Sequence, residues 1–292
     1  GHFYNWYDTQ SLKSLTPAYI STVDSGNLAG YLLTLKSGLS ELVNNKIIPD
    51  RLLDGLADTL MVISDVMRKS GAGEARSDGF PGDSRAYEIS PEISARLRRM
   101  EQELKQPAQT VDAIKMRLDS VLALTNEVID NAGSGAGDEL KWWLNALRKQ
   151  CLDCINDLTF WATWLSAPNP PENGLPQGSA EQISRLNQLR RMDHIPTFSE
   201  IAGFVSLTVP EIDRAIVTFK DGSASVSEWL LKFRAALVEA GQRVAGEITV
   251  INELVLQCDG FMDMDYGLLY VRSRNLMFIG YNVTEHMRDN SY

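Results

Sequence analysis

The sequence has 292 residues, of which 44% are hydrophobic, and a formal net charge of −10 at pH 7. This length and apolar content suffice for one large domain or two smaller ones with a buried core. The acidic balance argues against nucleic acid as a partner, because phosphate binding needs clustered lysine and arginine. No apolar run is long enough to cross a bilayer, and no signal peptide is visible.

The first nine residues, G-H-F-Y-N-W-Y-D-T, combine aromatic rings with an amide and a carboxylate. Pyranose rings present apolar C–H faces and a fringe of hydroxyl groups, so a sugar site needs flat aromatic surfaces beside polar acceptors. The candidate surfaces are Phe3, Tyr4, Trp6 and Tyr7, and the candidate acceptors are Asn5 and Asp8. Packing of the same rings in a core or on an edge strand is the alternative interpretation.

Residues 21–30, S-T-V-D-S-G-N-L-A-G, precede an apolar pattern of helical spacing that runs over residues 28–43. Asp24 or Ser25 is the expected N-cap, since either side chain can accept hydrogen bonds from the free backbone N–H groups of a helix start. Asp24 is therefore either a cap only or a group that also faces a ligand. At a helix N-terminus its charged form is favoured.

Helical patterns dominate the middle of the chain. Pro49-Asp50 opens a second helix, which we expect to form an antiparallel hairpin with the first. Residues 70–90 are rich in Gly, Ser, Asp and Arg and predict a mobile loop, and residues 168–178 predict a linker. Further helices are predicted over residues 92–105, 108–131, 138–165, 180–192, 198–204, 211–219 and 225–256, with 108–131 and 138–165 packed as a bundle.

The pattern changes near the end of the chain. Residues 268–271 and 277–281 alternate in the manner of strands, and Arg272-Ser273-Arg274-Asn275 separates them. This arrangement predicts a β-hairpin.

Two separated blocks carry a resemblance to a known family. The opening runs, F-Y-N-W-Y-D-T and S-T-V-D-S-G-N-L-A-G, and the closing runs, M-D-Y-G-L-L-Y, L-M-F-I-G-Y-N-V and D-N-S-Y, resemble the glycoamylase-like middle domain of bacterial cyclic β-1,2-glucan synthases. The blocks cover about a quarter of the chain, in the family's order. The resemblance implies a mainly α fold: the start of an (α/α)6 toroid in residues 1–69, a helical insertion in 70–256, and a β-hairpin with return to the toroid in 257–292.

The resemblance also implies a chemistry, in which the domain binds β-1,2-glucan and closes it into a ring by transglycosylation. Such a reaction needs two carboxylic groups flanking the scissile bond. We expect that pair downstream of Tyr292, outside this sequence, so the chain is interpreted as an inactive internal fragment. The expected glucan-binding residues are Tyr4, Trp6, Tyr7, Asp8, Asp24, Asn27, Tyr281, Asn282, Asp289 and Asn290.

Several partners and properties follow from the same resemblance. No cofactor is expected in this fragment, because UDP-glucose serves another domain of the parent. The other domains of the parent are expected partners, and the parent is expected in the bacterial inner membrane. A fragment of a toroid is also expected to expose apolar surface. The alternative function is a non-catalytic helical segment that binds carbohydrate or acts as an inter-domain scaffold.

The remaining motifs favour structural roles. Three cysteines, Cys151, Cys154 and Cys258, are sparse and point to a reducing compartment on the cytoplasmic side. Cys151-x-x-Cys154 lacks a second pair of ligands, so no metal site is predicted. An acidic cluster in one loop lacks the ligand pattern of a calcium site. The residues of this acidic cluster are Asp259, Asp263 and Asp265. The tryptophans on helices are expected in the core, namely Trp142, Trp143, Trp161 and Trp164. The histidines are expected on the surface, namely His2, His194 and His286.

Overall fold

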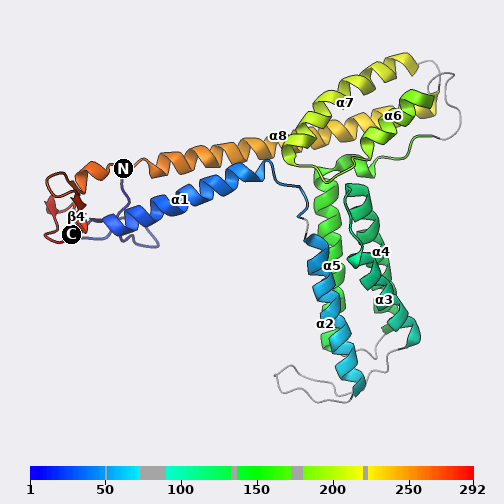
Figure 1. The fold of residues 1–292 in the computed structure, drawn as a ribbon, viewed down its shortest axis with the longest axis horizontal. Coiled ribbons are helices and arrows are strands. Elements are labelled where there is room, and N and C mark those ends of the chain that lie inside the picture. Colours follow the sequence, from blue (N-terminus) through cyan, green and yellow to red (C-terminus); the bar gives the residue numbers. More distant parts are fainter. Residues whose placement is uncertain (50, 73–89, 133–136, 172–179, 220–222) are drawn as a thin grey trace. The chain divides into compact units, whose positions relative to one another are not determined.

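A computed structural model describes residues 1–49, 51–72, 90–132, 137–171, 180–219 and 223–292. These residues are mainly helical, with short antiparallel strands in addition (Figure 1). The predicted loop and linker at residues 70–90 and 168–178 lie largely outside the described residues. No helix in the described part of the chain is long and apolar enough to span a membrane.

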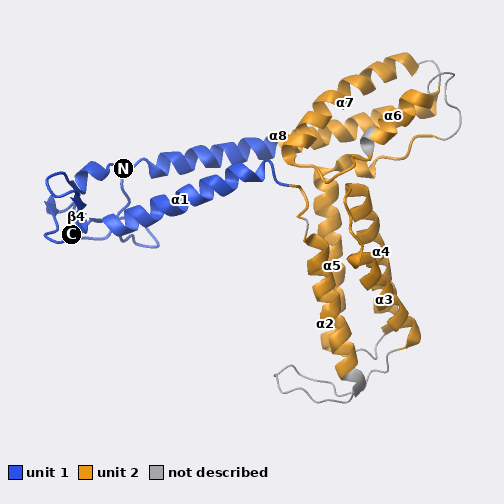
Figure 2. Ribbon diagram, viewed as in Figure 1, with its two compact units in different colours: residues 1–45, 246–292 blue, residues 46–245 orange. Residues whose placement is uncertain are grey.

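The chain divides into two compact units, coloured separately in Figure 2. Unit 1 consists of residues 1–45 and 246–292, and unit 2 of residues 46–245. Residues 46–69 therefore group with the insertion, and 246–256 with the ends of the chain, whereas the expected boundaries lay at 69/70 and 256/257. Helix α1 (Thr22–Leu42) belongs to unit 1 and α2 (Leu52–Ala72) to unit 2, so the predicted hairpin between them is wrong.

A four-helix bundle forms the first half of unit 2. It contains α2, α3 (Pro91–Lys105), α4 (Val111–Ala132) and α5 (Asp138–Trp161), and each helix contacts its two neighbours in a closed ring. The cause is the apolar spacing: in α4 the buried side chains recur every three or four residues, at Val111, Ile114, Leu118, Val121, Leu124, Thr125 and Val128. The bundle predicted for α4 and α5 is confirmed. Helix α2 packs against α3 and α5 because its apolar residues Leu56, Leu60, Ile63 and Met67 recur every three or four positions and are buried.

The second half of unit 2 is built from α6 (Ala180–Arg190), α7 (Phe198–Phe219) and the first part of α8 (Ala224–Met262), beside the short 3-10 helix η2 (Thr163–Ser166). Two separate helices were predicted in place of α7, and that prediction is wrong. Pro210 lies inside one continuous helix, whose buried residues Ile201, Thr208, Ile212 and Ala215 share one face. Packing of this face compensates for the backbone hydrogen bond that proline removes.

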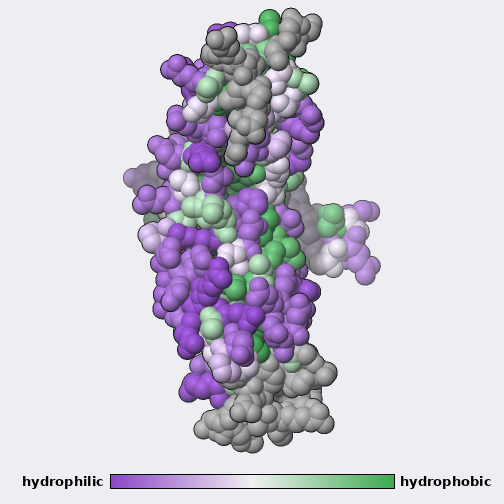
Figure 3. Space-filling view, turned by 90° about the vertical axis from the view of Figure 1, so that its right-hand side faces the viewer, coloured by the Kyte–Doolittle hydropathy of each residue, from purple (hydrophilic) through white to green (hydrophobic). Residues whose placement is uncertain are grey.

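The exposed surface on the face shown in Figure 3 is mostly hydrophilic, as expected when the apolar side chains of the helices form a core. Figure 3 shows hydrophilic side chains over most of the face in view, with hydrophobic ones in a narrow strip. Trp164 is fully buried, as expected, but Trp142 is 61% exposed, so its predicted place in a core is wrong. It contacts Trp143 edge-on instead, with the ring centroids 4.7 Å apart.

His194 supplies a pH dependence at the start of α7. Its Nδ1 lies 2.7 Å from Asp193 Oδ1 and its Nε2 3.4 Å from Glu200 Oε2, and the hydrogen bond with Asp193 raises the pKa of His194. Glu200 also accepts from the Thr197 N–H, while Thr197 Oγ1 accepts from the Glu200 N–H, which is a capping box. The stabilisation by His194 is complete below the unfolded pKa of about 6.5 and disappears as pH rises through the higher folded pKa.

Between pH 5.5 and 8.5, deprotonation of His194 should therefore lower the free energy of unfolding of unit 2 by less than about 1 kcal/mol. The effect is small because the site is solvent-exposed and its charges are screened. Urea unfolding at both pH values measures the difference, and an NMR titration of the ring gives the folded pKa. The variant His194→Gln should lack this part of the pH dependence. An His194 pKa at or below 6.5 would contradict the assignment.

Unit 1 pairs α1 with the last part of α8 (Figure 1). Lys36 Nζ contacts Asp259 Oδ1 at 2.6 Å, and the Tyr266 hydroxyl donates to the Ser25 carbonyl oxygen at 3.2 Å, so the two segments run antiparallel. Few apolar side chains are buried in this unit, namely Ile20, Ile251, Cys258, Met264 and Leu269. Many are exposed, among them Tyr31, Leu35, Leu42, Val250, Leu254 and Phe261. The expected exposure of apolar surface is confirmed.

The strands of unit 1 form two small sheets. Strands β2 (Tyr270–Val271) and β3 (Leu276–Met277) pair as the predicted hairpin, although it is short. Its expected extension to Tyr281 is wrong, because β4 (Gly280–Asn282) belongs to a second sheet of order β1-β4-β5. Strands β1 (Tyr19–Ser21) and β5 (Met287–Arg288) were not predicted.

Candidate functional site

Strand pairing brings the two motif blocks together. β1 runs antiparallel to β4, with Tyr19 opposite Asn282, Ile20 opposite Tyr281 and Ser21 opposite Gly280. The Thr22 side chain extends this contact by donating to the Phe278 carbonyl oxygen at 2.5 Å. The opening and closing blocks, far apart in sequence, therefore meet in one small sheet.

Gly280 permits this approach. A Cβ atom built at this position would lie 2.6 Å from the Ile20 carbonyl oxygen and would overlap the phenol end of Tyr19. No side chain fits there unless the strands separate. The glycine of the I-G-Y-N-V run is thus explained by close backbone approach.

Trp6, Tyr19 and Asp289 form the centre of the site. The Trp6 ring is stacked against Tyr19, with centroids 6.4 Å apart and planes 30° apart, and Trp6 is 53% exposed. The Tyr19 hydroxyl donates to Asp289 Oδ2. Burial, followed by the hydrogen bond with Asp289, raises the pKa of Tyr19 to about 12, so the phenol stays protonated and remains a donor at neutral pH. We call these three residues the Trp6–Asp289 cluster.

The other residues of the opening block hold this cluster in place. Asn5 attaches the block to β1, because its N–H donates to the Tyr19 carbonyl oxygen and its Oδ1 accepts from the Ser21 N–H. The Tyr7 hydroxyl accepts from the Tyr4 N–H at 2.9 Å. Asp8 Oδ1 accepts from both the N–H and the hydroxyl of Ser11, and these bonds lower the pKa of Asp8. Asp8 therefore stabilises a turn through Oδ1, and its predicted contact with a sugar stays a prediction.

The closing-block residues lie on both faces of the sheet. Side chains alternate along a strand, so Asn282 and Asp289 share the face of Tyr19, while Tyr281 lies on the other face opposite Ile20 and Arg288. Asn282 Oδ1 accepts from the Glu285 N–H, and Asn290 is exposed. The structure thus brings Asn282 and Asp289 together with the aromatic rings, and it separates Tyr281 from them.

Helix α1 does not use Asp24 as its cap. Ser21 is the N-cap, and its Oγ accepts from the Asp24 N–H at 3.2 Å. The prediction of Asp24 or Ser25 as the cap is wrong, because the helix begins one turn earlier than its apolar pattern indicated. Asp24 and Asn27 are exposed on the first turns of α1. Ser25 is buried and its Oγ lies 3.1 Å from His2 Nδ1, a contact that no sequence pattern predicts.

The dismissed metal and redox motifs have structural partners. Among the residues that the structure describes, no cluster of His, Cys, Asp and Glu could hold a metal ion. Asp259 pairs with Lys36, and Asp265 Oδ1 accepts from the Gly267 N–H. Burial raises the pKa of Cys151 to about 12, which leaves an unreactive thiol.

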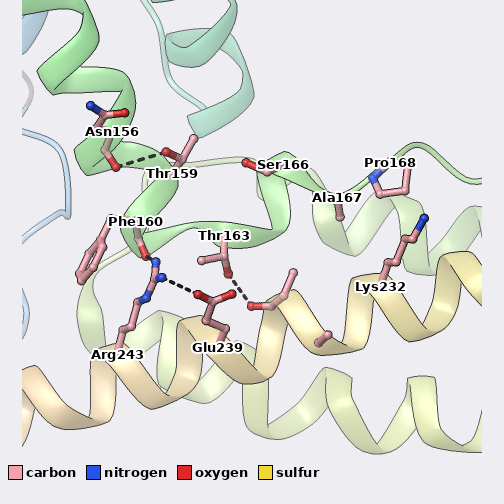
Figure 4. A pocket seen from close by; sticks show the side chains of 12 residues that line it. Asn156, Thr159, Phe160, Thr163, Ser166, Ala167, Pro168, Lys232, Glu239 and Arg243 are labelled. Carbon is pink, nitrogen blue, oxygen red and sulfur yellow. Dashed lines mark hydrogen bonds and ion pairs between the residues drawn. The ribbon is translucent and has the colours of Figure 1, made fainter.

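A groove of about 600 Å³ lies in unit 2, between the end of α5 and α8 (Figure 4). Its charged lining is already paired: Arg243 forms an ion pair with Glu239 and lies over the Phe160 ring, 4.2 Å from the centroid. The Thr163 hydroxyl donates to the Ala236 carbonyl oxygen. None of the predicted site residues lines this groove. The charged side chains of the groove are thus engaged within the protein, with Lys232 paired to Glu228 outside the lining, which favours a packing role.

Comparison with known proteins gives one partial match at a significant level. No protein-family model matches the chain. The cyclic β-(1,2)-glucan synthase NdvB of Rhizobium meliloti (strain 1021) is 36% identical to it over 70 residues. Part of this chain is similar to a cyclic glucan synthase. The aligned stretch is 24% of the chain and 2% of NdvB, so the chain matches only a small fraction of NdvB's length. The resemblance drawn from the motif blocks is confirmed to that extent.

Proposed function

We propose that unit 1 contributes to a β-1,2-glucan binding surface and supports cyclisation by transglycosylation in a polypeptide related to cyclic glucan synthases. The observation that carries this proposal is the Trp6–Asp289 cluster. Trp6 and Asp289 come from the two motif blocks, and the cluster combines an exposed indole face with a carboxylate that accepts from Tyr19. The similarity to NdvB, whose name describes it as the synthase of a β-1,2-linked glucan, supports the choice of ligand.

The chemistry of the cluster fits sugar binding better than bond cleavage. An exposed indole offers a flat apolar surface for the C–H face of a pyranose, and carboxylate and amide oxygens accept from its hydroxyls. Asp289 is already a hydrogen-bond acceptor for Tyr19, as a positioned binding group would be. Under the proposal, the cluster holds a glucan whose glycosidic bond is broken by carboxylic groups outside it.

Removal of the indole tests the proposal. The variant Trp6→Ala should bind linear β-1,2-glucan about tenfold more weakly, since one aromatic stacking contact is worth about 1 kcal/mol or slightly more. Isothermal titration calorimetry of the full 292-residue chain measures this affinity. Trp142→Ala is the matched control, because this tryptophan is similarly exposed but lies in unit 2. Equal losses in both variants, or none in Trp6→Ala, would contradict the proposal.

A further inference from the structure

Tyr19 connects the two halves of the cluster, although no sequence argument selected it. Its ring supports the Trp6 indole and its hydroxyl donates to Asp289. The residue is half-buried in β1, and its backbone carbonyl accepts from the Asn5 N–H at 2.9 Å. The position of Tyr19 is therefore set by β1, by the opening block and by Gly280, against which its phenol packs.

The Tyr19 hydroxyl acts on one oxygen of Asp289. The bond engages Oδ2, and no protein group among the described residues donates to Oδ1. The backbone N–H of Asp289 donates to the Gly280 carbonyl oxygen at 3.1 Å, which fixes the main chain beneath the carboxylate. Arg288, the adjacent cation, lies on the other face, where its Nε donates to the Leu268 carbonyl oxygen. Asp289 is thus oriented by Tyr19, and no cation in the described ranges forms an ion pair with it.

We propose that Tyr19 is a positioning residue that sets the spacing between a stacking surface, Trp6, and a hydroxyl-accepting carboxylate, Asp289, within a single sugar subsite. This inference rests on the proposed function. A carboxylate held in one rotamer, at a fixed distance from an aromatic face, distinguishes the orientation of the hydroxyl groups on a sugar ring. An aromatic face alone binds only the apolar side of that sugar. The subsite would take one glucosyl unit, with the ring on Trp6 and a hydroxyl group donating to Oδ1 of Asp289.

A double-mutant cycle separates this role from a purely structural one. Tyr19→Phe keeps the supporting ring and removes only the donor, so it should weaken binding of linear β-1,2-glucan about fivefold to tenfold without changing the fold. If Tyr19 acts through Asp289, the double variant Tyr19→Phe/Asp289→Ala should bind no more weakly than Asp289→Ala alone. By contrast, Tyr19→Phe and Trp6→Ala should have additive effects.

The full chain is used throughout, with calorimetry for affinity and circular dichroism for folding. Additive losses for Tyr19→Phe and Asp289→Ala would overturn the inference while leaving the proposed function intact. Absence of glucan binding by the unmodified chain would overturn both. Should Tyr19→Phe fail to fold, Asp289→Ala decides: it removes the acceptor that Tyr19 is proposed to position, so a folded variant with unchanged affinity would overturn the inference.

Discussion

Substitution of Gly280 by alanine is expected to separate β1 from β4 and so to remove the candidate site as a whole. The new Cβ would meet the Ile20 carbonyl oxygen at 2.6 Å, and backbone cannot move aside as the end of a flexible side chain can. We expect the free energy of unfolding of unit 1 to fall by more than about 2 kcal/mol, which is at the upper end of the usual cost of overpacking. Glucan binding should be lost with it.

Hydrogen exchange measures this effect residue by residue. The Val283 N–H, which donates to the Ala18 carbonyl oxygen, and the Thr22 N–H, which donates to Ile279, should exchange at least tenfold faster in Gly280→Ala. Gly38→Ala is the control, because a Cβ there meets nothing within 4 Å and the position is helical, so this variant should be slightly stabilised. Unchanged protection of Val283 in Gly280→Ala would show that the strands tolerate the extra atom.

Substitution of Phe233 by alanine is expected to have the largest effect on unit 2. Its ring is fully buried and is stacked with Trp229 at a centroid distance of 5.7 Å. Removal of a buried phenylalanine ring costs about 3–5 kcal/mol through lost transfer energy and the cavity left behind. Urea unfolding, followed by circular dichroism of the whole chain, should show the transition of unit 2 at markedly lower denaturant concentration.

An exposed side chain in the same half of unit 2 provides the control for Phe233→Ala. Leu207 of α7 is 75% exposed, so Leu207→Ala should change the free energy of unfolding by less than about 0.5 kcal/mol. If Phe233→Ala lowers the free energy of unfolding by less than about 1 kcal/mol, the core near Trp229 either collapses around the cavity or is loosely packed.

The helices of unit 2 could be predicted because their signals are local. Apolar residues recur every three or four positions in α4, and the buried residues of the structure follow that pattern. Helix α1 shows the limit of this reasoning: apolar side chains occur around its whole circumference, so the pattern does not select a partner. The hairpin with α2 was inferred from proximity in sequence, whereas α1 packs on the distant end of α8.

The candidate site was predictable only in part. Trp6 and Asp289 were selected from the motif blocks, and the structure places them on either side of Tyr19. Tyr19 was missed because β1 has only three residues and its partner strand lies about 260 positions away, beyond any local pattern. A usable signal was present: aromatic and β-branched residues at positions 19–23 favour a strand, but they were interpreted only as the approach to a helix.

Unit 1 is discontinuous in sequence, and this property determines the order in which the chain can fold. Unit 2 lies wholly between residues 46 and 245, so its helices find their neighbours over short separations, and such topologies fold fast. β1 and β4 must instead close a loop that contains all of unit 2. Loop closure over a flexible chain of that length carries an entropic cost, and a folded insertion replaces most of the flexible chain by a rigid body. We therefore expect β1 and β4, which carry the residues that we assign to glucan binding, to pair after the helices of unit 2 have found their neighbours.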